Sequence, residues 1–121
     1  MPYIDGFVIA VAAKDKQKFI AFAKHSNPVL KELGAIRSMD CWGDEVPVGT
    51  LTDFRKAVNA EDHETIVFSW VEWPNKETRD RGMARLNELA QTDERFDREK
   101  YPVPFDSARM ITGGFETIVE I

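Results

Sequence analysis

Long apolar runs are absent from this chain of 121 residues, and it has only one cysteine, Cys41. A membrane-spanning helix needs about 20 consecutive apolar residues, so we expect no membrane segment. A single cysteine cannot form a disulfide within the chain, which is compatible with a reducing compartment. The first residues also lack the basic and apolar regions of a secretory signal peptide, so we expect a cytoplasmic protein.

Positive charge is also scarce. The chain has 16 Lys and Arg residues against 21 Asp and Glu residues, which gives a formal net charge of -5. Nucleic-acid binding depends on Lys and Arg side chains that neutralise phosphates, and no basic stripe is present. We therefore do not expect nucleic acid as a partner, and RNA binding ranks third among the functions considered.

The usual signatures of metal and phosphate sites are missing. His25 and His63 lie in separate elements, and with one cysteine they do not give a usual metal-ligand spacing. Gly113-Gly114 enters a strand-like segment instead of opening a helix, which is the wrong context for a phosphate-binding loop. We expect neither a metal nor a cofactor.

What the sequence does have is strand character, strongest over residues 65–73. This segment is rich in β-branched and aromatic residues and contains no Gly or Pro. Side chains alternate along a strand, which assigns the apolar residues to two faces: Ile66, Phe68 and Trp70 on one, and Val67, Val71 and Trp73 on the other. The chain's own helices can cover one face, and a second copy of the chain is the simplest cover for the other.

Three further segments predict strands, at residues 3–12, 35–44 and 109–121. The first is apolar on both faces, whereas the second is more polar, as expected at a sheet edge. The order of elements is βαββαβ within a single domain over residues 1–121. With two right-handed crossovers, this order gives an α+β ferredoxin-like plait, a four-stranded antiparallel sheet whose first and third strands are central.

Helical periodicity predicts two main helices, over residues 15–33 and 75–90. Pro28 should break the first helix, and Asn75 should cap the second. The inward side chains of the second helix should be Met83, Leu86, Leu89 and Ala90. Shorter turns are expected at residues 54–58 and 93–96.

Several motifs resemble those of a known bacterial family. They are Asp5-Gly6-Phe7-Val8, Cys41 with the later Gly43-Asp44-Glu45-Val46-Pro47-Val48-Gly49, Phe68-Ser69-Trp70, Pro104-Phe105-Asp106, Arg109-Met110 and Gly113-Gly114-Phe115. Together they make the chain resemble the YbaA-like family, a domain-of-unknown-function group placed with the dimeric α/β-barrel proteins. The resemblance implies a ferredoxin-like subunit that forms a barrel-like homodimer, and it implies no catalytic residue.

Polar residues near these motifs form a candidate pocket. Asp40, Cys41 and Asp44 belong to the second strand, and Asp106 and Arg109 come near the start of the last. A histidine of the first helix and a tryptophan of the third strand could complete the group. The candidate pocket residues are His25, Asp40, Cys41, Asp44, Trp70, Asp106 and Arg109.

Each candidate also has a structural interpretation, which the sequence favours. Asp106 and Arg109 could bind a polar ligand beside a cleft, or could tie two loops together. Cys41 could be a nucleophile, but no neighbouring base activates it, and free cysteines are often buried as small hydrophobes. His25 could be a general base, but it lies beside the apolar stripe of its helix instead of within it.

Two functions of different classes remain open. In the first, the homodimer binds or transforms a small molecule in a pocket between sheet and helices, as do the cofactor-independent oxygenases that this superfamily resembles. In the second, the protein is a non-catalytic dimer that acts through protein contacts or stress-related binding, and its core is filled by side chains. The residues do not decide whether the chain is an enzyme.

Overall fold

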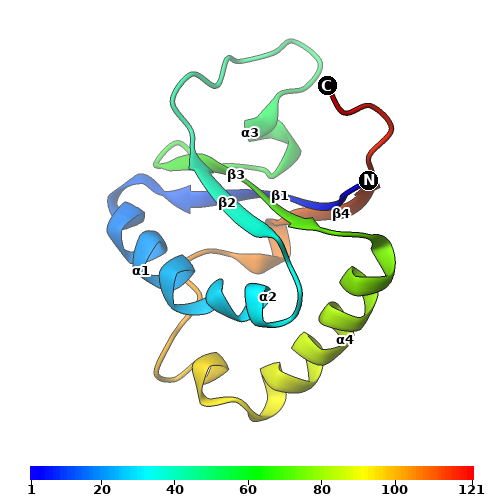
Figure 1. Ribbon diagram of the computed structural model, residues 1–121. Coiled ribbons are helices and arrows are strands. Elements are labelled where there is room, and N and C mark those ends of the chain that lie inside the picture. Colours follow the sequence, from blue (N-terminus) through cyan, green and yellow to red (C-terminus); the bar gives the residue numbers. More distant parts are fainter.

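The computed structural model describes residues 1–121 and contains one four-stranded antiparallel sheet (Figure 1). The strands are β1 (Tyr3–Ala12), β2 (Arg37–Trp42), β3 (Glu64–Trp73) and β4 (Ile111–Glu116). Their order in the sheet is β2-β3-β1-β4, so the first and third strands are central and β2 is at an edge. The predicted ferredoxin-like plait is confirmed.

Helices and short 3-10 turns connect the strands. They are η1 (Ala13–Asp15), α1 (Lys16–Ser26), α2 (Pro28–Glu32), α3 (Phe54–Ala57), α4 (Lys76–Thr92), η2 (Glu94–Phe96) and η3 (Ser107–Arg109). The break predicted at Pro28 separates α1 from α2, and Asn75 caps α4 by accepting a hydrogen bond from the Thr78 N–H at 2.8 Å. None of the helices combines the length and the hydrophobicity that crossing a membrane requires.

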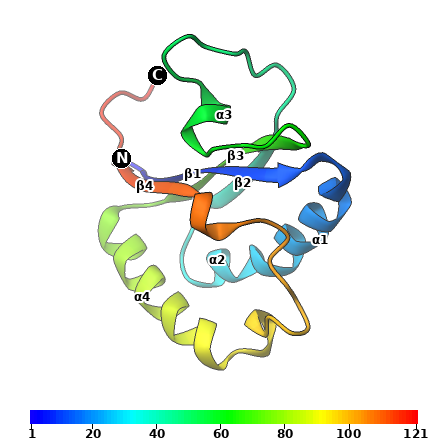
Figure 2. The ribbon, with the colours of Figure 1, turned by 180° about the vertical axis from the view of Figure 1, so that it is seen from behind.

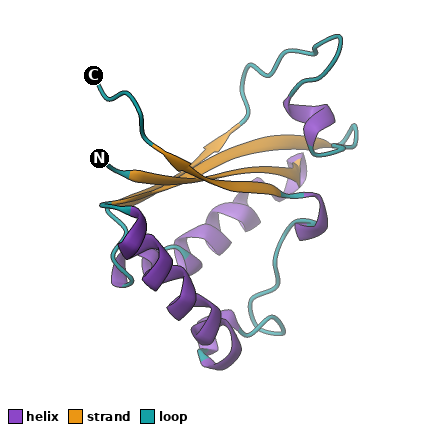
Figure 3. Ribbon diagram, turned by 90° about the vertical axis from the view of Figure 1, so that its right-hand side faces the viewer, coloured by secondary structure: helices purple, strands orange, loops and turns teal.

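The two faces of the sheet are covered differently. Figure 3 shows α1, α2 and α4 on one side, while α3, the loop before it and the C-terminal residues lie on the other. The side chains buried under the three helices include Ile9, Val11, Val67, Val71 and Trp73, as the alternation along the strands predicted. On the opposite face Ala10 and Ile66 pack with Val58 at the end of α3, so this short helix covers only part of that face.

Two predictions are wrong, one about where the last strand ends and one about which residues of α4 face inward. The last strand ends at Glu116 instead of residue 121, because Glu116 pairs with Tyr3, the first residue of β1, and no strand lies beyond it. Figure 2 shows β4 beside β1 after the chain has returned from the end of α4. Ala90 is exposed instead of inward, since it lies on the outer side of the last turns of α4.

Candidate functional site

A cavity of about 240 Å³ lies between the sheet and the helices. Residues of β1, β2 and β3 form its floor, and residues of α1, α2, α4 and the segment after α4 form its roof. Most of the lining is apolar, including Phe19, Phe22, Leu30, Met83, Leu86 and Phe105. Phe105 contacts Phe19 and Phe22, with ring centroids 6.0 and 5.9 Å apart. The long segment after α4 therefore returns to close one side of the cavity.

The volume of the cavity limits what could enter it. An apolar cavity of roughly 150 Å³ holds a benzene molecule, whereas pockets for drug-sized ligands measure roughly 300–1,000 Å³. The cavity in this protein falls between these sizes. It has room for one aromatic ring with a short substituent, or for a short aliphatic chain.

Asp40 forms a polar end to this cavity. Its two carboxylate oxygens accept hydrogen bonds from the Ser69 hydroxyl at 2.6 Å and from the Asn27 side-chain amide at 2.7 Å. Asp40 pairs with Ser69 in the β2–β3 register, so strand pairing places both side chains on the helix-covered face. Asp40 is exposed and also borders two surface hollows, so it lies at the boundary between the cavity and solvent.

Ser26 adds a second polar group to the lining. Its hydroxyl oxygen is buried and has no hydrogen-bond partner in the protein. A buried polar atom without a partner costs about 1–3 kcal/mol, so proteins usually pair such atoms. Ser26 directly precedes Asn27 at the end of α1, and both residues line the cavity.

A buried ion pair lies at another part of the cavity floor. Asp5 of β1 is 3% exposed and accepts hydrogen bonds from the indole N–H of Trp73 at 2.9 Å and from Arg79 of α4 at 2.9 to 3.2 Å. The carboxylate raises the pKa of Arg79. The two oxygens of Asp5 accept two hydrogen bonds each, which uses the acceptor capacity of an ionised carboxylate. This group therefore joins two strands to α4 instead of offering free acceptors to a ligand.

Arg109 forms a second ion-pair network, away from the cavity. Its guanidinium contacts both oxygens of the buried Glu64 at 2.7 and 2.8 Å, one oxygen of Asp106 at 3.0 Å and the Asn59 carbonyl at 2.9 Å. Hydrogen bonds from Arg109 lower the pKa of Glu64 to about 2 and also lower the pKa of Asp106. The network fastens η3 to the start of β3.

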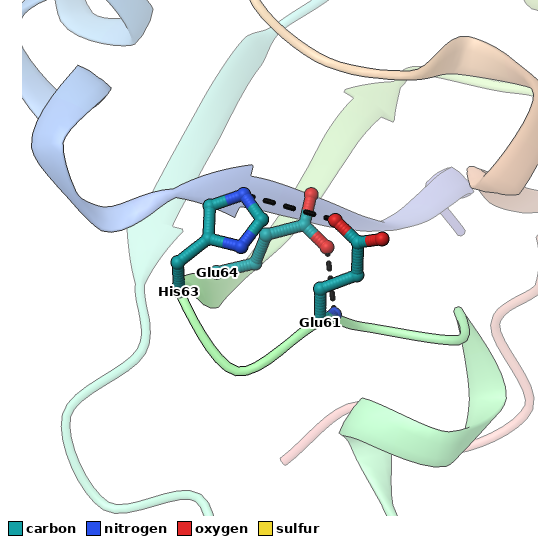
Figure 4. A group of neighbouring side chains, drawn as sticks. All are labelled: Glu61, His63 and Glu64. Carbon is teal, nitrogen blue, oxygen red and sulfur yellow. Dashed lines mark hydrogen bonds and ion pairs between the residues drawn. The ribbon is translucent and has the colours of Figure 1, made fainter.

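Glu64 also belongs to the group of side chains in Figure 4, which have the residue types of metal ligands. Each of Glu61, His63 and Glu64 offers one possible ligand atom, and these three atoms lie within 4.8 Å of one another. However, Arg109 already contacts both oxygens of Glu64, and its positive charge opposes a cation at this position. The geometry is that of an ion pair in which Glu64 also accepts from the Glu61 N–H at 2.8 Å.

The seven residues predicted for a pocket are not brought together. Asp40 lines the cavity, whereas Asp106 and Arg109 belong to the network with Glu64. Trp70 borders the cavity from β3, but its ring lies on the opposite face of the sheet beside that of Phe68, with ring centroids 5.9 Å apart. Cys41 lies opposite Phe68 in the sheet and so on the face without the long helices. Asp44 is exposed in the loop after β2.

The other candidate, His25, has an interaction of its own. It stacks on Tyr101 with ring centroids 3.8 Å apart, and its Nε2 is 3.2 Å from the carbonyl oxygen of Arg95. It is not among the residues that line the cavity. The histidine therefore holds the segment after α4 against α1.

The sheet face without the long helices carries a wide apolar groove of about 570 Å³. Its lining includes Val8, Phe68, Trp70, Ile111 and Phe115, of which Phe68 is 45% and Phe115 60% exposed. The prediction that this face is apolar is confirmed. The groove is open to solvent in a single chain, unlike the region covered by α3.

Comparisons with known proteins agree with these observations. Residues 2–107 match the family described as "Protein of unknown function (DUF1428)". The uncharacterized protein YbaA of Escherichia coli (strain K12) and that of Shigella flexneri are each 46% identical to this chain over 120 residues, 99% of either chain. A crystal structure described as a dimeric ferredoxin-like protein from an uncultured marine organism covers 100% of both chains with a TM-score of 0.62 and 13% identity. This last likeness concerns the fold.

Proposed function

The chain belongs to the DUF1428 family of proteins of unknown function, as its motifs predicted, and from this premise we propose that it is a homodimeric protein that binds a small, mainly apolar molecule. The binding site is the cavity between the sheet and α1, α2 and α4. A single cysteine that is not in a disulfide fits a reducing compartment, and we place the protein in the cytoplasm.

The observation that carries this proposal is the cavity itself. A well-packed protein interior leaves few voids larger than a water molecule, whereas the cavity between the sheet and the helices measures about 240 Å³. Binding pockets are typically apolar with a few polar groups that orient the ligand, and Asp40 with its two hydrogen-bond donors is such a group. Filling this space with a ligand would bury apolar surface that the protein alone leaves without contacts.

A comparison of two alanines on one helix tests the proposal. Ala23 of α1 lines the cavity, whereas Ala21 of the same helix is exposed and does not. In a thermal-shift screen of single-ring and short-chain metabolites, we expect compounds that raise the Tm of the original protein and of Ala21→Leu, but not of Ala23→Leu. A ligand at 100 times its Kd stabilises a protein by about 2.7 kcal/mol, which such a screen detects.

The screen has two outcomes that would contradict ligand binding in the cavity. One is that no compound raises the Tm of the original protein. The other is that Ala23→Leu responds to the same compounds as fully as Ala21→Leu does, since the added side chain would then occupy space that the ligand does not use.

A second candidate function is a non-catalytic dimer that acts through protein contacts. The observation in its favour is the amount of exposed apolar surface outside the cavity, including Leu51 at 95% and Ile118 at 82% exposure. A pull-down that captures a defined protein with the original chain, together with a screen in which no ligand raises the Tm, would favour this function over the first. RNA binding ranks third, and the net charge of -5 opposes it.

A further inference from the structure

We infer that the cavity selects neutral single-ring compounds that carry a hydroxyl group, and that Asp40 accepts the hydrogen bond from this hydroxyl. The inference rests on the proposed binding function and names the class of ligand. It follows from the free acceptor capacity of Asp40, from the charges around the mouth of the cavity, and from the unpaired hydroxyl of Ser26.

Asp40 retains acceptor capacity after its interactions within the protein. An ionised carboxylate offers about four lone-pair sites, and Ser69 and Asn27 use one on each oxygen. These two donors hold the carboxylate in a fixed orientation at the polar end of the cavity. Asp40 forms no ion pair with any Lys, Arg or His residue, unlike Asp5 and Glu64. It is therefore an oriented acceptor that a donor on a ligand can reach.

The charges around Asp40 favour a neutral ligand. The surface hollow at the mouth is lined by Lys24 and Lys31 in addition to Asp40, so an ammonium group would meet two positive charges there. Arg37 also borders this hollow, but its guanidinium pairs with Glu72 at 3.2 Å on the opposite face of the sheet. A carboxylate on the ligand would instead lie beside the Asp40 carboxylate, with an apolar lining behind it. A hydroxyl group avoids both costs and can still donate to Asp40.

Ser26 gives independent support for a polar atom on the ligand. Its buried hydroxyl is the one side-chain polar atom in the protein that is both buried and without a partner. A polar atom on a bound ligand would give this hydroxyl a partner, because a serine hydroxyl can both donate and accept a hydrogen bond. The rest of the lining includes Phe19, Phe22 and Phe105, which suit the faces and edges of one aromatic ring.

Titration of the 121-residue chain with three probes of similar size tests the inference. The probes are 4-ethylphenol, ethylbenzene and 4-methylbenzylamine, and NMR of the backbone amides measures their binding. A hydrogen bond to a charged group is expected to make 4-ethylphenol bind about tenfold more tightly than ethylbenzene. In Asp40→Asn an amide oxygen can still accept but carries no charge, so we expect the preference to fall to about threefold or less while the Kd of ethylbenzene stays unchanged. Asp44→Asn, which changes an exposed aspartate whose side chain accepts no hydrogen bond within the protein, should keep the preference.

The outcomes separate this inference from the proposed function. Equal binding of 4-ethylphenol and ethylbenzene, tighter binding of the amine, or a preference that stays tenfold in Asp40→Asn would overturn the inference while leaving the cavity as a binding site. Binding of none of the three probes would overturn both. The amide spectrum of Asp40→Asn reports whether the variant is folded, and Ser69→Ala, which removes one of the two donors that orient the carboxylate, should weaken the preference without the charge change.

Discussion

At the scale of single residues, two arginines each hold a buried carboxylate, and the two ion pairs connect segments that are distant in sequence. Arg79 reaches Asp5 across 74 positions, and Arg109 reaches Glu64 across 45. An ion pair of this kind contributes little relative to apolar residues, but removing one partner leaves a buried charge and costs about 3–5 kcal/mol. The stability of this fold should therefore be sensitive to loss of either arginine.

The first prediction concerns Arg79. In Arg79→Met, Asp5 keeps only the hydrogen bond from Trp73, and we expect the free energy of unfolding to fall by about 3 kcal/mol. Arg81→Met is the matched control, because Arg81 forms only an exposed pair with Glu77 and should change stability by less than about 0.5 kcal/mol. Urea denaturation at pH 7 measures both. Equal effects of the two substitutions would contradict the role given to Asp5.

The second prediction concerns the pH dependence that Glu64 contributes. The pKa of Glu64 falls from 4.5 to about 2 in the folded protein, so the stabilisation is fully present above pH 4.5 and is lost as the pH falls towards 2. Glu64→Gln should lower the free energy of unfolding by about 2 kcal/mol at pH 7. The difference between the two proteins should shrink between pH 4.5 and pH 2.

Denaturation curves of both proteins at a series of pH values test this second prediction. Asp62→Asn provides the control, since Asp62 is exposed and forms no ion pair. A difference between the original protein and Glu64→Gln that stays constant down to pH 2.5 would show that Arg109 does not stabilise the charged form of Glu64.

The sequence allowed only part of this residue-level picture to be predicted. Asp40 was a candidate because it lies among polar residues of an edge strand, but its partners Ser69 and Asn27 depend on strand register and on how α1 docks. Asp5 was visible as a charged residue in an apolar strand, although nothing in local spacing identifies Arg79 as its partner. Side-chain contacts between distant segments are set by tertiary packing, which periodicity does not encode.

At the scale of elements, the period of the apolar residues predicted the helices and strands and the two central strands. The length of β4 was predicted less well, because a strand ends where its partner strand ends and not where its strand-like composition ends. The inward face of α4 was also predicted to extend one residue too far, to Ala90, which is exposed. The close contact of α4 with the sheet was also not predicted. It depends on Gly82, whose missing side chain leaves room for Trp73.

The third prediction therefore concerns Gly82→Ala. A Cβ atom there would lie 2.7 Å from the ring of Trp73, which is fully buried, and 3.1 Å from the Leu33 carbonyl oxygen. Alanine favours a helix over glycine by about 1 kcal/mol, but overpacking a buried ring costs about 1–3 kcal/mol. We expect a net loss of stability of about 1 kcal/mol in urea denaturation.

An exposed position on α4 separates these two contributions. Ala84 is exposed, so Ala84→Gly should lose about 1 kcal/mol from helix propensity alone. If Gly82→Ala stabilised the protein by the amount that Ala84→Gly loses, the packing of Trp73 against α4 would not be as tight as described.

At the scale of the whole molecule, the helix-free side of the sheet carries apolar residues that a single chain leaves in water. Phe68 and Phe115 line the groove, while Leu51 in the loop before α3 and Ile118 in the C-terminal segment are more exposed still. Figure 3 shows that the loop and the C-terminal segment extend from the same side of the sheet. A second copy seated on this face would contact the groove and both segments, and stable interfaces bury about 800 Å² per partner.

The fourth prediction is that Phe68→Asp prevents this pairing. Phe68 lines the groove from β3, where it contacts Trp70 and Phe54 with ring centroids 5.9 and 6.1 Å apart, so a carboxylate there would be buried against apolar residues of the partner. Buried aromatic residues at the hot spots of an interface contribute at least about 2 kcal/mol, so the dissociation constant of the dimer should rise by about 30-fold or more. The control Ala84→Asp, on the outer surface of α4, should leave the dissociation constant of the dimer unchanged.

Sedimentation velocity over a range of concentrations distinguishes these outcomes. Because Phe68 is already 45% exposed in one chain, Phe68→Asp should remain folded as a monomer. If Phe68→Asp formed a dimer of unchanged affinity, the interface would lie elsewhere and a second copy of the chain would not cover the apolar groove.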